Sequence, residues 1–277
     1  MNSDELLTLL PIGLLAGFCG GLLGIGGSVV IIPALIIFFG GRQQHLYQAA
    51  AMIVNFFVVV PSVIRHFQAR ATLRPITRWM IPGALIGVVA GVYLSELPVF
   101  RGAGQGYLQI AFAIFLAYVL IYNLRRLTSA IRMPRISESQ AAERSGFVAF
   151  AGVGVPTGVT GGLLGIGGGL FAVPAQQLLL RIPLRNAIAN SASAILWTSV
   201  VGAAFKSAKL SGHGHDWTDA IWMAIVMAPP AMIGSWYSAA KVHVWPVRVT
   251  RLAFSLLLIY AIIRLATTGW AQIYGGS

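Results

Sequence analysis

Residues 6–39 form one run without a charged side chain, and glycines crowd the centre of that run. As a single helix these 34 residues would be about 50 Å long, whereas the hydrocarbon core of a bilayer is about 30 Å thick. The centre of the run reads GGLLGIGGS from Gly20 to Ser28, and such a density of glycine favours a break in a helix. We therefore predict two half-helices that are joined at mid-membrane.

The same pattern returns in the second part of the chain. Residues 17–35 read GFCGGLLGIGGSVVIIPAL and residues 158–176 read GVTGGLLGIGGGLFAVPAQ, so the two segments lie 141 positions apart and share 11 of 19 letters. A weaker likeness links residues 82–87 with residues 229–234. The chain therefore consists of two similar halves, and internal repeats of this kind recur among transporters, with the binding site at the interface between the repeats.

The composition places both halves in a membrane. Hydrophobic residues make up 57% of the chain and charged residues 9%, with a mean hydropathy of +0.80, whereas soluble domains carry about 25% charged residues. We predict an all-α polytopic membrane protein with about eight membrane segments. It would divide into a first repeat (residues 1–124), a cytoplasmic linker (125–145) and a second repeat (146–277). Besides the two glycine-broken runs, the apolar runs are residues 46–64, 76–94, 107–124, 187–205, 220–240 and 249–263.

Two topologies fit these runs, and basic residues discriminate between them. If each glycine-broken run crosses the membrane once, the loops on the side of the termini carry 12 Lys and Arg residues and the opposite loops carry 7. If each is a re-entrant hairpin, the halves are inverted, both termini lie outside, and 14 basic residues face the cytoplasm against 5 outside. We favour the inverted arrangement because it has the larger bias. The formal charge of +12 is then a topology signal, and we expect no nucleic-acid partner.

A helix that begins inside the membrane can bind an anion. Its first four backbone N–H groups lack partners within the helix, and the macrodipole adds about half a positive charge at that end. We predict that the two breaks form such an anion site. The alternative interpretation is that the glycines only allow helices to pack closely. The predicted residues of the site are Gly24, Gly26, Gly27 and Ser28 in the first break and Gly165, Gly167, Gly168 and Gly169 in the second.

Polar side chains in the apolar runs are further candidates. Asn55 lies near the centre of its run, and Asn190 and Ser193 occupy the matching region of the second half. Such residues usually face the interior of a helix bundle, where they either line a substrate path or form interhelical hydrogen bonds. Both interpretations stay open. At the ends of the same runs, His66 and Lys206 either attract anions at the mouth of a path or serve as interfacial anchors.

The sequence gives no sign of enzyme chemistry. It contains none of the phosphate-binding, zinc-protease or serine-hydrolase motifs. All seven acidic residues fall at ends or in connections, so we expect neither a carboxylate proton relay nor a sodium site in the membrane, and transport that is electrogenic. The tract His213-Gly214-His215-Asp216 resembles a metal-binding motif, but we interpret it as incidental in an exposed loop. We expect no metal and no cofactor.

The duplicated glycine motif with its trailing proline, Pro33 or Pro174, resembles the sulfite exporter TauE/SafE family of membrane permeases. The resemblance covers essentially the whole chain. It implies transport of sulfite or a small organosulfonate, mostly outward, across the bacterial inner membrane. Members often have a polar Thr-Ser pair in the helix after the second motif, and we identify Asn190-Ser191 as the corresponding residues here.

The expected partners are therefore a small anion and the lipid bilayer, and a homo-oligomer stays open. Two rival functions remain. One is a permease for another small anion such as a carboxylate. The other is a membrane scaffold that does not transport and packs on a partner through faces of small residues.

Overall fold

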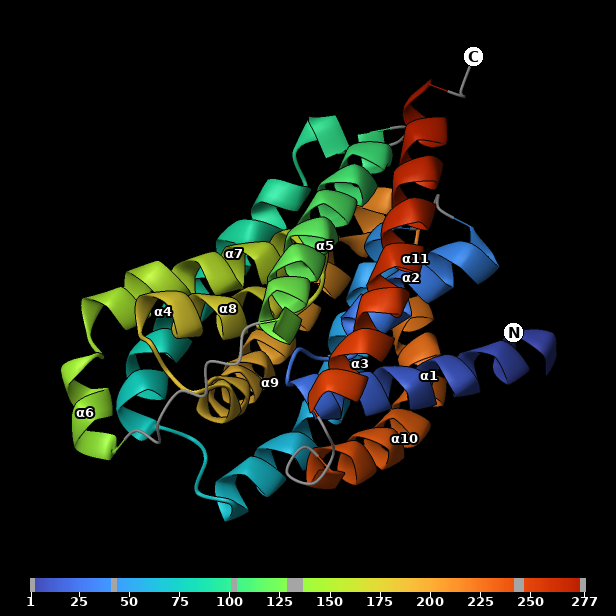
Figure 1. The fold of residues 1–277 in the computed structure, drawn as a ribbon. Helices are drawn as coiled ribbons and strands as arrows, with labels where there is room; N and C mark the ends of the chain where they lie inside the picture. Colours follow the sequence, from blue (N-terminus) through green and yellow to red (C-terminus); the bar gives the residue numbers. More distant parts are fainter. Residues whose placement is uncertain (1–2, 41–43, 101–103, 129–136, 242–246, 275–277) are drawn as a thin grey trace.

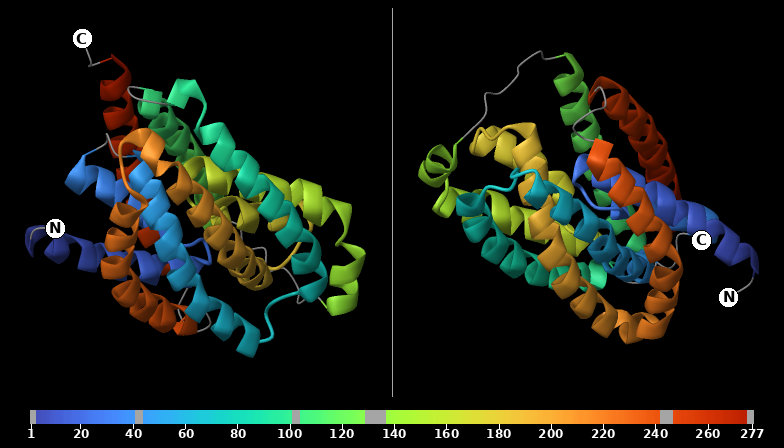
Figure 2. Two further views of the ribbon diagram at one scale, coloured as in Figure 1. Left: turned by 180° about the vertical axis from the view of Figure 1, so that it is seen from behind. Right: turned by 90° about the horizontal axis from the view of Figure 1, so that it is seen from below.

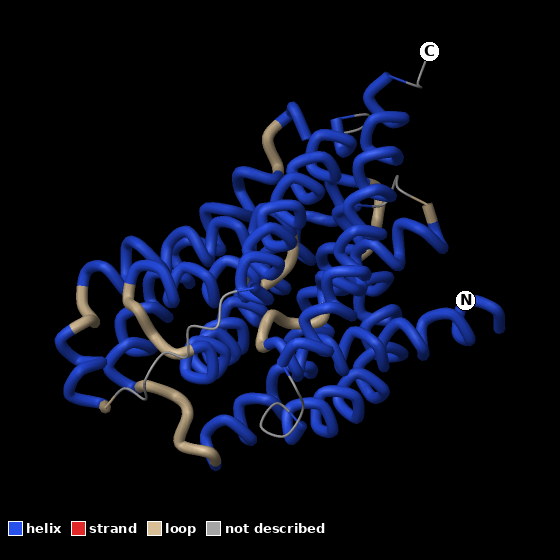
Figure 3. The backbone as a smooth tube through the Cα atoms, viewed as in Figure 1, coloured by secondary structure: helices blue, strands red, loops and turns tan. Residues whose placement is uncertain are grey.

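The computed structural model describes residues 3–40, 44–100, 104–128, 137–241 and 247–274, and every regular element in them is helical (Figures 1 and 3). The first half contains α1 (Ser3–Leu23), α2 (Ser28–Phe39), α3 (Gln44–Gln68), α4 (Arg74–Ser95), the 3-10 turn η2 (Pro98–Phe100) and α5 (Gln105–Thr128). The second half contains the π-helical segment η4 (Val148–Gly154), α7 (Val155–Leu164), α8 (Gly169–Leu179), α9 (Leu184–Lys209), the 3-10 turn η5 (Leu210–His213), α10 (Trp217–Lys241) and α11 (Val247–Tyr274).

The helix lengths agree with a polytopic membrane protein. In the described part of the chain, α1, α3, α4, α5, α9 with η5, and α10 are long and apolar enough to cross a bilayer. The segments 28–39 and 148–164 are apolar but shorter. The prediction of an all-helical, multi-pass membrane protein is therefore confirmed.

Both glycine runs interrupt their helices at the predicted place. The backbone turns through the left-handed region, with φ of +64° at Gly24, +81° at Gly26, +68° at Gly167 and +85° at Gly168. Only glycine adopts this region without a steric penalty. The first helix is longer than a half-helix, because α1 has 21 residues. Its break nevertheless lies beside Asn55, near the middle of α3, and α2 then reverses the direction of the chain.

The two halves repeat the same helix contacts. Gly17 of α1 lies so close to Ala231 of α10 that a Cβ atom would overlap the backbone there. Gly158 of α7 lies in the same way against Ala84 of α4. Under the sequence repeat Gly17 corresponds to Gly158, and Ala84 corresponds to Ala231. The contact between α1 and α10 is therefore the counterpart of the contact between α7 and α4. Close packing by small residues is thus part of the fold, beside the breaks themselves.

Equivalent helices of the two halves run antiparallel. Gln48, near the start of α3, bonds Lys206, near the end of α9, while Ala69, just after α3, accepts a bond from Arg185 at the start of α9. Similarly α5 and α11 lie side by side (green and red in Figures 1 and 2). Gln109 near the start of α5 bonds Gln272 near the end of α11.

The α7–α8 hairpin returns to the end of the bundle from which it starts. α7 runs in the same direction as α4, because Gly83 lies against Phe150 and Gly91 against Val159. α8 then leads back to the start of α9, where Asn190 bonds Gln176 of α8 as well as the backbone N–H of Leu73, which precedes α4. The α1–α2 hairpin is its counterpart and approaches from the opposite side (Figure 1).

The region predicted as a linker is partly helical. α5 continues to Thr128, and a short helix α6 (Glu138–Glu143) begins with a capping box between Ser137 and Gln140. Arg144 ties the following turn to the second half by donating to the backbone carbonyl of Arg181 at 3.1 Å. Residues 129–136 of the predicted linker lie outside the described residues, and the division into two repeats and a linker stays a prediction.

Candidate functional site

Asn55 of α3 lies between the two glycine breaks. Its side chain is fully buried, and Oδ1 accepts hydrogen bonds from the backbone N–H groups of Gly27 at 2.6 Å and Ser28 at 3.0 Å. These are two of the groups that the start of α2 leaves unpaired. A Cβ atom on Gly26 would lie 2.9 Å from the same Oδ1, so the close approach of Asn55 requires glycine there.

The first break is therefore capped by the protein itself. The sequence suggested that an anion occupies both helix starts, but the Oδ1 of Asn55 already satisfies two N–H groups of the first. The hydroxyl of Ser28, predicted as an extra donor to a ligand, instead bonds the carbonyl of Ala51 on α3 at 3.2 Å. The sequence left two roles open for Asn55, a substrate path or an interhelical hydrogen bond. Its oxygen forms an interhelical hydrogen bond. Its amide nitrogen does not take part in that bond.

The second break has no such cap in the described part of the chain. The residue before α8 is Gly168, which has no side chain to cap it, and within the described residues no other side chain accepts a hydrogen bond from the first N–H groups of α8. The Nδ2 atom of Asn55 is buried and has no hydrogen-bond partner among the described residues, and it lies 3.1 Å from where a Cβ atom of Gly167 would be. One side chain thus contacts both breaks. Its acceptor is used at the first, and its donor lies between the two, because Nδ2 is also 3.1 Å from the Cβ position of Gly26.

Two residues with hydroxyl groups, Ser199 and Thr157, lie beside the same break. The Oγ atom of Ser199 lies 3.3 Å from the position of a Cβ atom on Gly167, and Thr157 packs against Gly168. The Ser199 and Thr157 hydroxyl oxygens are buried without a hydrogen-bond partner in the part of the chain that the structure describes. An unpaired buried polar atom is costly. Three residues that lie against Gly167 or Gly168 thus carry such an atom, and a polar ligand at this break would satisfy those that face it.

Sequence reasoning missed Ser199 and its neighbour Thr198, which donates to the carbonyl of Gly167 at 2.9 Å. We had identified Asn190-Ser191 as the polar pair of the second half, yet Thr198-Ser199 is a Thr-Ser pair and lies at the second break. The sequence did contain a sign of this pair. Adding the repeat offsets of 141 and 147 positions to Asn55 gives residues 196–202, the range that includes Thr198 and Ser199.

The other polar residues predicted for the site make structural contacts. Asn190 uses both ends of its side chain, accepting from the N–H of Leu73 at 2.8 Å and donating to Gln176 at 2.9 Å. Ser193 donates to Ala189 in its own helix at 3.0 Å. No contact within the described residues joins either side chain to Asn55 or to the second break.

His66 and Lys206 lie at opposite ends of the bundle, because α3 and α9 are antiparallel. Both side chains are buried, whereas the sequence suggested that they either attract anions at a mouth or serve as interfacial anchors. Lys206 donates hydrogen bonds to Gln48 at 2.5 Å and to Ser95 at 2.6 Å. These bonds offset part of the cost of removing an ammonium group from water. If His66 or Lys206 acts at the mouth of a substrate path, it does so from a position that the surrounding helices cover.

Comparison with known proteins agrees with this architecture. The family model of the sulfite exporter TauE/SafE family matches residues 9–265. The chain belongs to the TauE/SafE family. Its members among the relatives are described as membrane transporters rather than enzymes, and the family name refers to sulfite. No solved structure matches the chain.

Several relatives of this family member come from bacteria. The chain is 30% identical to the probable membrane transporter protein MamO of Magnetospirillum gryphiswaldense over 95% of its own length, and it spans 45% of that protein. It is 28% identical to the probable membrane transporter protein YunE of Bacillus subtilis, covering 91% of this chain and 96% of YunE. A probable membrane transporter protein of Haemophilus influenzae is 25% identical over 94% of this chain and 97% of that one.

Proposed function

We propose that this protein transports a small sulfur oxyanion or organosulfonate through the centre of the helix bundle, and that the anion binds at the second glycine break beside Asn55. The observation that carries the proposal is the buried Nδ2 group of Asn55, a hydrogen-bond donor that faces Gly167 and has no partner in the described residues. An oxyanion supplies the acceptor that this donor lacks.

The surrounding groups favour an anion over a cation. Hydroxyl groups of Thr157 and Ser199 can donate, and the start of α8 presents the positive end of its macrodipole. All these groups are neutral. A site without a fixed positive charge holds an anion weakly enough to release it, which a transporter requires as much as binding.

We further propose that the two halves are inverted repeats. The antiparallel pairs α3 with α9 and α5 with α11 support this, as do the hairpins that enter from opposite ends. The end that contains Arg70, Arg74 and Arg185 then faces the cytoplasm of a bacterial inner membrane, and both termini face outside. Asn55 lies where the two repeats meet, which is the usual place of a substrate site in such folds.

The site is closed in this structure. The side chains of Asn55, Thr157 and Ser199 are each 0% exposed, so the proposed anion reaches them only when the helices around them move. The α1–α2 and α7–α8 hairpins start from opposite ends of the bundle, and movement of each against α3 and α9 opens the site to one side at a time. This is alternating access around a central site.

The decisive variant is Asn55→Asp in proteoliposomes loaded with sulfite. A carboxylate keeps the oxygen that caps Gly27 and Ser28 but replaces the donor NH2 group with a negative oxygen, which repels an anion. We expect sulfite efflux to fall at least about tenfold, which corresponds to about 1.4 kcal/mol. Ser193→Ala is the matched control because it removes a polar group from the neighbouring helix α9 without touching the breaks.

Competition identifies the class of substrate. Sulfite and sulfoacetate are expected to inhibit each other's efflux, and acetate to inhibit weakly. Equal inhibition by acetate would show that the substrate is a small anion in general rather than a sulfur anion. The proposed function would be refuted if sulfite efflux were no faster than from liposomes without the protein, or if Asn55→Asp left it unchanged.

A further inference from the structure

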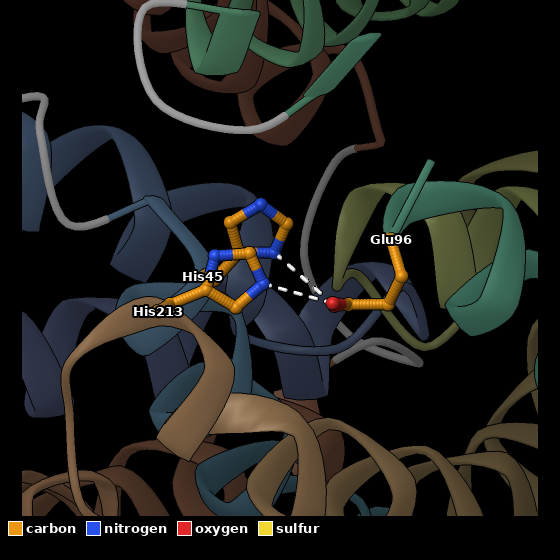
Figure 4. Close-up of side chains that lie close together, drawn as sticks. All are labelled: His45, Glu96 and His213. Atoms are coloured by element: carbon orange, nitrogen blue, oxygen red, sulfur yellow. Dashed lines mark hydrogen bonds and ion pairs between the residues drawn. The ribbon is translucent and has the colours of Figure 1, made fainter. Parts of the chain in front are cut away.

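Three metal-ligating side chains from distant parts of the sequence meet at one end of the bundle (Figure 4). His45 is the second residue of α3, Glu96 directly follows α4, and His213 ends η5. Their candidate ligand atoms all lie within 4.8 Å of one another. The side chains are 2%, 11% and 6% exposed, respectively. Figure 4 shows both imidazole rings turned toward the one carboxylate.

The hydrogen bonding of His45 determines what can lie between it and Glu96. Its Nε2 atom is 3.3 Å from the backbone carbonyl of Phe100. A carbonyl oxygen can only accept, so Nε2 carries the hydrogen of this bond. The other nitrogen, Nδ1, faces Oε1 of Glu96 at 3.6 Å. In the neutral ring Nδ1 is also an acceptor, and two acceptors face each other favourably only with a cation between them, either a proton or a metal ion.

Several features match a metal site rather than a protonated pair alone. Two imidazole nitrogens and one carboxylate oxygen form the ligand set of many zinc sites that keep a fourth position open. A bond from the second ring nitrogen to a backbone carbonyl, as His45 makes to Phe100, is the usual outer contact of a metal-bound histidine. The two rings stack with centroids 3.9 Å apart and nearly parallel, which brings their nitrogens to the same side.

We propose that His45, Glu96 and His213 bind a divalent transition-metal ion of the zinc class. In a tetrahedral site with metal–ligand distances of about 2.0–2.2 Å, neighbouring ligand atoms lie about 3.4 Å apart. His213 Nε2 is 2.8 Å from Glu96 Oε2 in this structure, so the ion replaces that direct hydrogen bond by separating the two atoms slightly. The bound ion links the start of α3, the end of α4 and η5.

The proposal departs from the expectation of no metal, which treated the tract from His213 to Asp216 as incidental. Of the tract from His213 to Asp216 only His213 takes part. His215 instead lies 3.9 Å from Asp219 and is more exposed. The matched variants His213→Ala and His215→Ala therefore remove the same side chain two positions apart, one inside the cluster and one outside it.

Lys206 sets the charge next to this cluster. Its Nζ bonds the hydroxyl of Ser95, the residue before Glu96. A divalent ion then shares the field of Glu96 with an ammonium group, which weakens its binding through repulsion. We expect binding tight enough to measure with micromolar protein but weaker than at a structural zinc site.

The test is zinc binding by the purified full-length protein in detergent, after removal of metal with a chelator. Calorimetric titration with Zn²⁺ is expected to give one ion per chain, with Mg²⁺ giving no heat because it prefers oxygen ligands. His213→Ala and Glu96→Gln are each expected to weaken zinc binding at least about tenfold. His215→Ala should bind as the unmodified protein does. The measurement is independent of transport, so it stands or falls separately from the proposed function.

A thermal melt provides the second readout and controls for misfolding. Zn²⁺ is expected to raise the melting temperature of the unmodified protein and of His215→Ala, because it binds only the folded state, but not that of Glu96→Gln. The conservative Glu96→Gln variant keeps the shape of the side chain if His213→Ala does not fold. Absence of stoichiometric zinc binding, or equal affinity in His213→Ala and His215→Ala, would overturn the proposal and leave a protonated His–Glu pair.

Discussion

The amide group of Asn55 lies 3.1 Å from the position that a Cβ atom of Gly167 would occupy, although the two residues belong to different halves of the chain. The same side chain caps the first break through Gly27. A single side chain therefore touches both interruptions. Its acceptor is used at the first, and its donor lies between the two, 3.1 Å from the Cβ positions of both Gly26 and Gly167.

Gly167→Ala is expected to abolish transport while the protein still inserts into the membrane. The residue has a φ of +68°, where alanine costs about 1–2 kcal/mol, and its methyl group would lie against Asn55 and Ser199 in the proposed anion site. Sulfite efflux should fall at least about tenfold. Gly212→Ala is the control, because a Cβ atom there meets nothing within 4 Å. Normal efflux from the Gly167→Ala protein would place the anion elsewhere.

Glycines in the helix contacts should affect stability in both halves alike. A Cβ atom on Gly158 would overlap the backbone of Ala84, and one on Gly17 that of Ala231. Each alanine substitution is expected to lower stability by about 1–3 kcal/mol through overpacking, seen as a lower melting temperature in detergent. Gly152→Ala, whose nearest neighbour atom is 3.4 Å away, should change it little. A large difference between the Gly158 and Gly17 variants would contradict the equivalence of the repeats.

Cysteine labelling in intact cells tests the orientation. Single cysteines are placed at the exposed residues Ser139 in α6 and Ser211 in η5, in a background where the native Cys19 is changed to alanine. In the inverted arrangement Ser211→Cys reacts with a membrane-impermeant maleimide from outside, and Ser139→Cys reacts only after the cells are broken. The reverse labelling would show that the protein has the opposite orientation in the membrane. Labelling of both cysteines from outside would exclude the proposed topology.

Efflux is expected to carry charge and to need no sodium. All seven acidic residues lie at the ends of helices or in connections, so no carboxylate within the apolar runs is available to bind a sodium ion. An anion that leaves a negative-inside compartment gains about 2.3 kcal/mol per charge for each 100 mV. Imposing a potassium diffusion potential on proteoliposomes should therefore speed sulfite efflux. A requirement for a sodium gradient would show that a coupling site exists among other groups.

The helix breaks and the duplication follow from local properties that the sequence displays directly. A run of apolar residues longer than the bilayer must turn, and glycine is the residue whose backbone turns at the smallest cost, so Gly26 and Gly167 marked the breaks without knowledge of any neighbour. The length of α1 did not follow in the same way, because the charged residues Asp4 and Glu5 end the apolar run but do not end the helix.

Side-chain partners were decided only by the tertiary structure. Asn55 and Asn190 look alike in sequence, yet one lies between the breaks and the other joins Leu73 to Gln176. Which way a polar group on a buried helix faces depends on the rotation of that helix and on the direction of the helix packed against it. The antiparallel packing of α3 and α9 brings Lys206 to Gln48 and His213 to His45. No single segment of the sequence encodes it. Local glycine content and hydropathy thus determined where the chain bends, whereas the packing of distant helices determined which polar groups meet there.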